Sequence, residues 1–438
     1  MPRKLSRRTM LKGFGASIAA PFVYRTHATA APSETLYHAS FGAGGMAGSD
    51  LNAITESKHV KLVAVADVDI ERAESLKEKF PDVKVYQDWR ELLDKEKNLN
   101  SVNVSTPDHM HASITMRAIQ QGLHVYTQKP LTQTVYESRQ LAKAAHNKKI
   151  VSQMGIQIHS HGVHRTVVAT IQAGAIGKVK EVHSWSGKMW GDKNPRPAKK
   201  DATPAKLNWN DWLGVASERD FIAGYYHPGN WRKRLDFGTG TFGDMGCHIL
   251  DPVFSSLALT APTSIRSAGD APNADSWGLE TAVKFVFPGT KFTTDTVALT
   301  WTNGNARPPE AVQKLLGDIK IVDQGSIYIG TEGVMYSPYI GPLVLFPEEK
   351  FKEYKGPSLP GENHYLQFVE ACRGNGKTSA PFEYAGPLTE SVLLGCLSTR
   401  FPNETLDWNA TDMKIMNVAA ANQYVRRTYR KGWEVDGL

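Results

Sequence analysis

The sequence predicts an α/β fold in which a doubly wound parallel sheet is followed by an α+β domain with a large, mostly antiparallel sheet. Strand-like and helix-like segments alternate between residues 33 and 155, as in doubly wound sheets. From about residue 262 to 355, apolar runs are separated by turns, as in antiparallel strands. A chain of 438 residues is sufficient for two domains. We therefore expect domains over residues 33–155 and 156–438.

The first predicted domain contains a regular series of strands and helices. The run Val60 to Ala66 is almost continuously apolar, which is typical of a parallel strand covered on both faces. Thr134 and Glu137 have the spacing of a capping box that begins a helix. In order, we expect strand 36–41, a glycine turn, a helix to about 56, strand 60–66, helix 70–80, strand 102–104, helix 112–121, strand 124–126 and the capped helix.

The second predicted domain begins with long loops and continues with strands. Residues 185–235 are rich in Trp, Pro, Gly and Lys and predict ordered loops. The runs Ala282–Phe287 and Ile319–Val322 predict antiparallel strands. Helical periodicity returns at residues 364–372 and 388–398. Three cysteines without regular spacing predict neither a disulfide framework nor a zinc site, and we expect no metal.

The basic charge of the chain is concentrated at its N-terminus. Residues 1–30 hold six Lys and Arg side chains and no acidic ones, so that the formal charge of +7 falls to +1 without them. A nucleic-acid partner is therefore not indicated by charge. The pair Arg7-Arg8, the short apolar stretch Gly13–Val23 and Ala28-Thr29-Ala30 together predict a twin-arginine signal peptide over residues 1–30, and hence export to the periplasm or medium. An uncleaved anchor is the alternative, although 11 apolar residues are too few for an ordinary membrane span.

A dinucleotide-binding turn follows the first predicted strand. Gly42, Gly44, Gly45 and Met46 fit the glycine fingerprint, with Ala47 in the third glycine position. Small residues allow the backbone to turn tightly, and a pyrophosphate then binds at the helix N-terminus. The sequence thus predicts a Rossmann dinucleotide-binding domain.

Two further features extend the predicted cofactor site. Asp67 ends the next strand, where a carboxylate can bind both ribose hydroxyls and would repel a 2′-phosphate, so NAD is favoured over NADP. Thr106 and Pro107 end a later strand at the carboxyl edge of the sheet, where cofactors bind. His111 either shapes the nicotinamide end or caps the next helix.

Candidate acid–base residues occur in both halves of the chain. Lys129 follows a predicted strand, and Asp244 and His248 are four apart on one face of a predicted helix. Oxidation of an alcohol requires a base for the hydroxyl proton, and histidine or a tuned lysine suits that task. An isolated Asp-x-x-x-His is more often a surface pair or a partial metal site. The catalytic hypothesis for these three residues therefore requires that they lie together at a dinucleotide site. We expect Lys129 and His248 to converge on one ligand.

Together these motifs resemble the glucose–fructose oxidoreductase/inositol dehydrogenase/rhizopine-catabolism (Gfo/Idh/MocA) family over the whole chain after residue 30. The resemblance covers the glycine fingerprint, Ala66–Asp69, Thr106 to His111, Lys129-Pro130, Gln172–Val179 and Gly243–Asp251. It implies a Rossmann domain and a sheet-based substrate domain that usually mediates oligomerisation.

The resemblance also implies roles for the acid–base residues. His248 would be the general base, Asp244 its orienting partner, and Lys129 an acid/base at the reacting oxygen that also contacts the cofactor. One departure is Gln128, where the family usually has glutamate. This removes a negative charge beside Lys129 and leaves the amine in place.

The tryptophan-rich loops suggest a carbohydrate substrate. Five of the ten tryptophans lie between residues 185 and 231, and aromatic faces can stack on sugar rings. Tyr226 and Arg232 are the preferred substrate contacts, although these aromatic residues could equally pack the loops. The resemblance implies a sugar, polyol or glycoside.

The sequence leaves three functions open. The first is an oxidoreductase that holds its NAD tightly after export. The second is a redox-neutral NAD-dependent glycosidase or lyase that acts through a transient keto-sugar. The third is a binding or sensor protein on the same fold, which the presence of both Lys129 and His248 disfavours.

Overall fold

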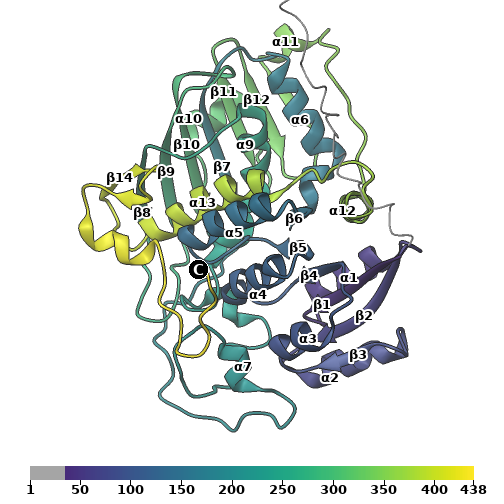
Figure 1. Ribbon diagram of the computed structural model, residues 1–438. Coiled ribbons are helices and arrows are strands. Elements are labelled where there is room, and N and C mark those ends of the chain that lie inside the picture. The colour runs from purple at the N-terminus through teal and green to yellow at the C-terminus, as the bar shows by residue number, and fades with distance from the viewer. Residues whose placement is uncertain (1–34) are drawn as a thin grey trace, which may run out of the picture. The chain divides into compact units, whose positions relative to one another are not determined.

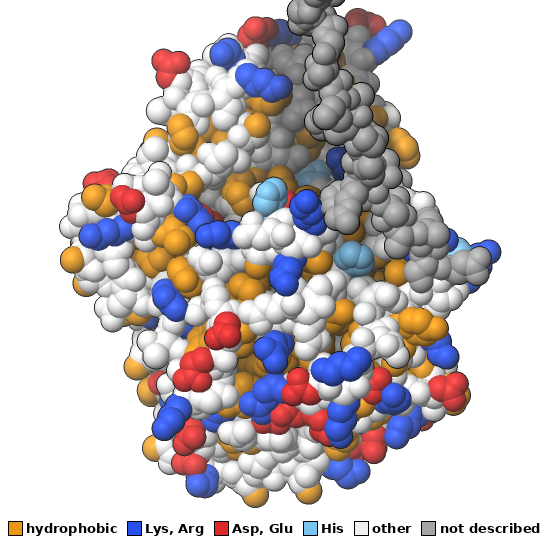
Figure 2. Space-filling model, in the orientation of Figure 1, with side chains coloured by type: hydrophobic (Ala, Val, Ile, Leu, Met, Phe, Trp, Pro, Cys, Tyr) orange, Lys and Arg blue, Asp and Glu red, His pale blue; other side chains and the backbone are white. Residues whose placement is uncertain are grey.

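The computed structural model describes residues 35–438, which form two sheets and the helices around them (Figure 1). The predicted signal peptide, with Arg7-Arg8 and Gly13–Val23, lies outside the described residues. No helix in the described part of the chain is long and apolar enough to cross a membrane. Figure 2 shows Lys and Arg side chains mixed with Asp and Glu over the lower part of the visible face.

The first sheet confirms the predicted doubly wound fold. Its six strands are all parallel and run in the order β3-β2-β1-β4-β5-β6. Because β1 is central and the strand order reverses there, the crevice at the carboxyl ends of β1 and β4 is the expected cofactor position. The strands are β1 Leu36–Phe41, β2 Val60–Ala66, β3 Lys84–Tyr86, β4 Ser101–Val104, β5 His124–Gln128 and β6 Ser152–Gly155.

The second sheet has nine strands and is mostly antiparallel. Its order is β13-β12-β11-β7-β10-β9-β8-β14-β15, and only the central pair β7 and β10 is parallel. The strands are β7 Val179–Ser186, β8 Ser264–Gly269, β9 Thr281–Pro288, β10 Thr293–Asn303, β11 Gln324–Gly330, β12 Val334–Pro338, β13 Val344–Phe346, β14 Thr405–Asn409 and β15 Lys414–Ile415.

Helices of both halves meet between the sheets. Figure 1 shows α5 and α13 side by side where the second sheet adjoins the first domain. Ser138 on α5 donates to the carbonyl of Gly386 at 3.0 Å, and Arg139 pairs with Glu390 at 2.6 Å. The helices are α1 Met46–Thr55, α2 Ile70–Ser75, α3 Trp89–Lys95, α4 Asp108–Gln120, α5 Val135–Lys148, α6 Gly162–Gln172, α7 Trp209–Leu213, α8 Gly240–Ile249, α9 Asp251–Leu257, α10 Glu310–Gln313, α11 Glu348–Phe351, α12 His364–Cys372 and α13 Phe382–Ser398.

Some element boundaries differ from the sequence expectation. The capping box is confirmed, because Thr134 and Glu137 exchange side-chain and backbone hydrogen bonds at the start of α5. The helix expected from residue 112 begins at Asp108, directly after Pro107. The strand expected at 319–322 is wrong: this segment is a loop, and Ile319 and Ile321 pack against the core cluster around Trp185. An alternating apolar pattern therefore reports burial here without strand pairing.

Polar residues within β1 belong to a buried network. The His38 ring contacts the Ser101 hydroxyl at 2.9 Å through Nδ1 and the Asn103 amide oxygen at 3.0 Å through Nε2. Burial lowers the pKa of His38 to about 4, although its bond to Asn103 opposes the shift. The neutral ring thus satisfies polar groups on the neighbouring strand β4, so a polar side chain is tolerated in the sheet centre.

Burial of neutral His38 predicts a loss of stability in acid. The folded-state pKa lies below the ordinary value of 6.5, so the unfolded chain binds the proton first and stability falls as pH drops from 6.5 toward 4. Between pH 7 and 4.5, the unfolding free energy of His38→Gln should fall by about 2 kcal/mol less than that of the wild type, as measured by denaturant titration. His146→Gln, at a ring 73% exposed, is the matched control and should leave the loss unchanged. Equal pH dependence in both variants would contradict the assignment.

Candidate active site

A cavity of about 360 Å³ joins the carboxyl edge of the first sheet to helix α8 of the second domain. Twelve of the residues that the sequence predicts for cofactor, catalysis or substrate line it, and ten of them are Gly42, Gly44, Gly45, Met46, Asp67, Thr106, Pro107, His111, Lys129 and Arg232. Asp244 and His248 line it from α8. Residues from distant parts of the sequence thus share one cavity, and Lys129 and His248 lie on the same one.

The glycine turn has a backbone conformation and close contacts that require residues without a Cβ atom. Gly42 has a φ of 100°, and a Cβ atom there would lie 2.8 Å from the carbonyl oxygen of Ser105 and 2.9 Å from the Cβ of Ala47. Gly45 has a φ of 56°, and nothing lies within 4 Å of the position of its absent Cβ. Only glycine suits the first position, whereas the second is open toward a ligand. This cradle at the start of α1 fits a pyrophosphate group.

Asp67 fastens the glycine turn to the end of β2. Its carboxylate accepts from the backbone N–H of Ala43 at 2.9 Å and of Asp69 at 3.0 Å. Burial raises the pKa of Asp67, and these two N–H groups together with Arg72 oppose the shift. Arg72, which the sequence reasoning missed, lines the same part of the cavity and pairs with Asp69 at 3.0 Å. An acid and a guanidinium are therefore both present in the cavity wall after β2, where they would contact the ribose of a dinucleotide.

His111 connects two turns at the cavity. Its Nδ1 contacts the carbonyl of Pro130 at 2.7 Å, and its Nε2 contacts the carbonyl of Thr106 at 2.9 Å. The residue lies in the first turn of α4, whose N-cap is Pro107, so His111 does not cap the helix. The ring instead ties the Thr106-Pro107 turn to the turn after Lys129.

Lys129 and Asp244 form a buried ion pair across the two domains. The Lys129 ammonium donates to Oδ1 of Asp244 at 2.7 Å and to its backbone carbonyl at 2.6 Å. The Trp190 indole donates to the other carboxylate oxygen at 2.9 Å. Burial opposes ionisation of Asp244, but Lys129, with Arg232 and Lys188, outweighs it and holds the pKa well below its ordinary value. Asp244 is therefore a permanent carboxylate that fixes the ammonium.

His248 is neutral and accessible from the cavity. Burial lowers the pKa of His248 to about 3; the nearby Lys129 ammonium acts in the same direction, and the carboxylates of Asp244 and Asp251 oppose the shift. Its Nδ1 is buried without a hydrogen-bond partner among the described residues. The polar contacts of Asp244 go to Lys129, Trp190, Arg232 and Lys188, and none that the structure describes goes to His248. The expected role of Asp244 as orienting partner of His248 is thus not supported; it positions Lys129.

The predicted substrate contacts divide into one at the cavity and one in the core. Arg232 lines the cavity, lies 3.5 Å from Asp244 through Nε, and stacks over the rings of Trp190 and Trp231 at 5.6 and 4.2 Å. Tyr226 is only 1% exposed, packs with Trp209 and Trp212, and is not among the residues that line the cavity, so the structure does not support it as a substrate contact. Aromatic density in the sequence did not distinguish packing rings from cavity rings.

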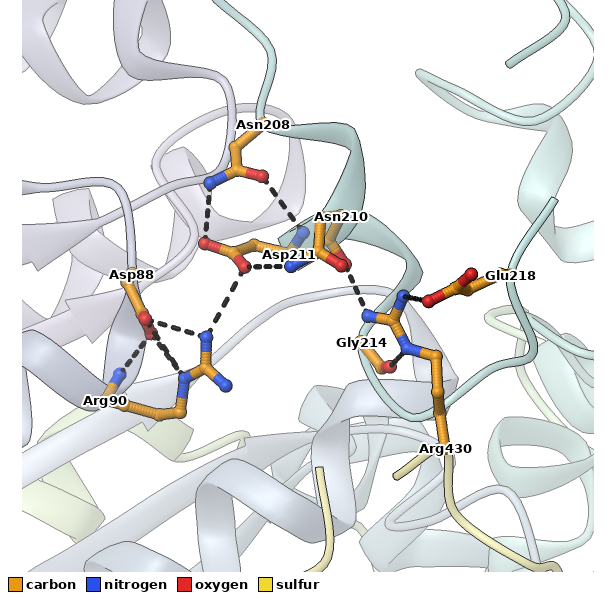
Figure 3. A network of polar contacts seen from close by, with 8 residues as sticks. All are labelled: Asp88, Arg90, Asn208, Asn210, Asp211, Gly214, Glu218 and Arg430. Carbon is orange, nitrogen blue, oxygen red and sulfur yellow. Dashed lines mark hydrogen bonds and ion pairs between the residues drawn. The ribbon is translucent and has the colours of Figure 1, made fainter. Parts of the chain in front are cut away.

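A polar network holds the loop that closes the far end of the cavity. Figure 3 shows Asp211, which lines the cavity from α7, between Asn208 and Arg90. Asn208 donates to Asp211 at 2.7 Å, and Arg90, fixed by Asp88 at the start of α3, reaches Asp211 at 3.4 Å. From the C-terminal segment, Arg430 donates to the carbonyls of Gly214 and Asn210. Residues of α3 and of the C-terminal segment therefore both hold the loop around Asp211.

A second polar cluster lies behind α8. His159, His164 and Asp251 are the one group in residues 35–438 with the ligand types and spacing for a metal ion, although we expected none from the sequence. Asp251 accepts from His159 at 3.0 Å and from the hydroxyl of Tyr384. These protein donors satisfy the buried carboxylate at the start of α9, whereas neither ring nitrogen of His164 has a hydrogen-bond partner among the described residues, although its Nδ1 lies 3.3 Å from Asp251.

Replacing Asp244 should lower the free energy of unfolding more than replacing Lys129 does. Asp244→Asn leaves the largely buried ammonium with neutral acceptors only, the backbone carbonyl and the amide oxygen, and should lower the unfolding free energy by about 3 kcal/mol. Lys129→Met should cost about 1 kcal/mol, because Arg232, Lys188 and Trp190 remain around Asp244. Chemical denaturation at pH 7 measures both. The reverse order would show that Asp244 does not serve to hold Lys129.

The chain matches two family models in succession. Residues 38–156 match the oxidoreductase family NAD-binding Rossmann fold (GFO_IDH_MocA), and residues 165–291 match the C-terminal alpha/beta domain of the same oxidoreductase family. Solved structures share the fold: GenD2 from gentamicin A biosynthesis, in complex with NAD, has a TM-score of 0.58 at 18% identity and covers 86% of this chain and 98% of its own. The WlbA dehydrogenase from Bordetella pertussis, in complex with NADH and UDP-GlcNAcA, has a TM-score of 0.61 at 12% identity over 86% and 99%.

Curated relatives match over shorter segments. A levoglucosan dehydrogenase from Pseudarthrobacter phenanthrenivorans is 24% identical over 43% of this chain and 40% of its own length. An NADP(+)-named scyllo-inositol 2-dehydrogenase from Bacillus subtilis is 23% identical over 47% and 48%. The chain thus spans less than half the length of these two relatives. With both family models matched in order on the expected two sheets, the chain belongs to the Gfo/Idh/MocA family of oxidoreductases.

Proposed function

We propose that the protein is an NAD-dependent dehydrogenase acting on a hydroxyl group of a sugar, polyol or glycoside. The observation that carries this proposal is the convergence of the glycine cradle with Lys129, Asp244 and His248 on one cavity. The cradle at Gly42 has no room for a Cβ, and the cavity runs from the start of α1 to α8. These features fit a dinucleotide: the glycine turn at the start of α1 would hold its pyrophosphate, and Lys129 and His248 would contact its reacting end.

The residues of the chain supply the proton chemistry. When bound, a nicotinamide cofactor supplies the hydride acceptor. Lys129 donates a hydrogen bond to the reacting oxygen, and its position is set by the two contacts with Asp244. His248, neutral above its pKa of about 3, accepts the hydroxyl proton as hydride leaves the same carbon. The adjacent ammonium makes the resulting imidazolium unfavourable, which favours its release of the proton to water after the reaction.

The substrate wall supports a carbohydrate. Arg232 and Trp231 line the cavity, Arg232 lies 3.5 Å from Asp244, and the Trp190 indole donates to Asp244. Hydroxyl groups can bind the charged groups while a sugar ring packs against Trp231. The names of the relatives, levoglucosan dehydrogenase and inositol dehydrogenases, support the same class of substrate.

The proposed protein is exported and forms a homo-oligomer. The twin-arginine run at Arg7-Arg8 supports export of the folded protein, with NAD retained because it is not replenished outside the cytoplasm. The resemblance supports a homo-oligomer formed through the second sheet. Recovery of the chain in a periplasmic fraction, with NAD released on denaturation and a mass of several protomers in light scattering, is the expected result. A protein that releases no dinucleotide on denaturation would contradict retention.

The two acid–base residues can be tested directly. Lys129→Met and His248→Gln should each lower kcat by about 100- to 1,000-fold, measured by reduction of added NAD over a panel of sugars and polyols. Lys148→Met and His146→Gln on the exposed part of α5 are matched controls and should stay near wild type. Wild-type kcat in both active-site variants would refute the proposed mechanism.

Asp67 should determine the choice between NAD and NADP. Asp67→Ser removes the carboxylate that would repel a 2′-phosphate and leaves Arg72 in the cavity to bind it. The ratio of kcat/KM for NADP to that for NAD should rise by about 10-fold or more. Arg72→Ala in the same background should cancel that rise. A ratio unchanged in Asp67→Ser would show that another group selects the cofactor.

A further inference from the structure

A buried carboxylate on α1 contacts three segments around the cavity. Asp50 is 0% exposed. Its oxygens accept from the Gln128 amide at 2.9 and 3.0 Å, from the Ser105 hydroxyl at 2.7 Å and from the Tyr365 hydroxyl at 2.8 Å. Among residues 35–438 no Lys or Arg is paired with it. Each of these contacts uses Asp50 as an acceptor.

Two of its partners line the cavity directly. Ser105 follows β4, and Gln128 ends β5 immediately before Lys129. The side-chain amide oxygen of Gln128, Oε1, in turn accepts from the backbone N–H of Lys129 at 3.3 Å. A Cβ at Gly155 would lie 2.7 Å from the Gln128 amide, so β6 holds this side chain from behind. Asp50 is therefore linked to the Lys129 backbone through one side chain.

The chemistry of these contacts determines which way the Gln128 amide points. A carboxylate can only accept, so it requires the NH₂ group of Gln128 on its side. The amide oxygen must then face the N–H of Lys129. If Asp50 were an amide, the Gln128 group could turn over and place a donor against that N–H.

The same contacts explain the departure at position 128. The resemblance expects a glutamate beside Lys129, and the chain has an amide there. A carboxylate nevertheless lies one hydrogen bond away, on a different element. The chain thus has a carboxylate close to the turn before Lys129, supplied by α1 and not by residue 128.

We propose that Asp50 is a positioning residue for Lys129, which orients the Gln128 amide and thereby fixes the turn that carries the ammonium into the cavity. This role rests on the proposed dehydrogenase function. Burial raises the pKa of Asp50 to about 6 against the hydrogen bonds of Ser105, Gln128 and Tyr365, so the group is predominantly ionised at pH 7.5. The cost of burying this charge is consistent with retention for a specific purpose.

An exchange of the two side chains tests the proposal. Asp50→Asn allows the Gln128 amide to turn over, and Gln128→Glu places two carboxylates about 3 Å apart. Each single variant should lower kcat by about 10-fold or more and weaken NADH binding by about 3-fold, measured by fluorescence titration. The double variant Asp50→Asn/Gln128→Glu restores one acceptor-only group and one amide, and should return both values to within about 3-fold of wild type.

The control removes a different contact of Asp50. Tyr365→Phe deletes one hydrogen bond to the carboxylate and leaves Gln128 in place, so kcat should stay within about 3-fold of wild type. Thermal unfolding confirms that each variant is folded at the assay temperature. If a single variant does not fold, recovery of both folding and kcat in the double variant supports the proposal.

Three outcomes overturn it. They are a wild-type kcat in Asp50→Asn, a double variant no better than the worse single one, or a Tyr365→Phe variant as impaired as Asp50→Asn. If the wild-type protein oxidises nothing in the panel, the proposed function fails separately. The exchange is then scored by NADH affinity alone, where the same loss and recovery supports the positioning role and their absence overturns it.

Discussion

The ion pair between Lys129 and Asp244 is the interaction on which the rest of the site depends. It joins the end of a parallel strand in the first domain to helix α8 in the second, at 2.7 Å. A buried charge of either sign is costly alone, so each domain supplies the partner that the other requires. The cavity lies where these two elements meet, and both partners of the pair line it.

Several polar groups that look unfavourable in the sequence are satisfied by one another in the fold. His38, in the centre of the sheet, contacts Ser101 and Asn103. Asn103 donates to Ser105, and Ser105 donates to Asp50. This chain of hydrogen bonds passes beneath the cofactor turns, from the strand centre to the carboxylate that faces Gln128. Each of these polar side chains thus has a hydrogen-bond partner within the fold, as buried polar groups require.

The electrostatics give the three acid–base residues different roles. Lys129 and Asp244 hold each other as opposite charges, whereas the pKa of His248 is lowered to about 3 and its ring stays neutral. A proton acceptor and a cationic hydrogen-bond donor can therefore exist side by side at neutral pH. The packing of α5 against α13 and the network around Asp211 keep the two halves of the site in place.

The sequence by itself predicted the alternation of strands and helices in the first domain, the glycine turn and the candidate acid–base residues, although it also predicted a strand at 319–322 where the structure has a loop. These depend on local rules: a strand followed by small residues predicts a cofactor turn, and a four-residue spacing places Asp244 and His248 on one helix. It did not determine contacts between distant segments. The pairing of Asp244 with Lys129 in preference to His248, the burial of Tyr226 and the contact of Asp50 with Gln128 were decided by tertiary structure, because each joins residues whose neighbours in space are remote in the chain.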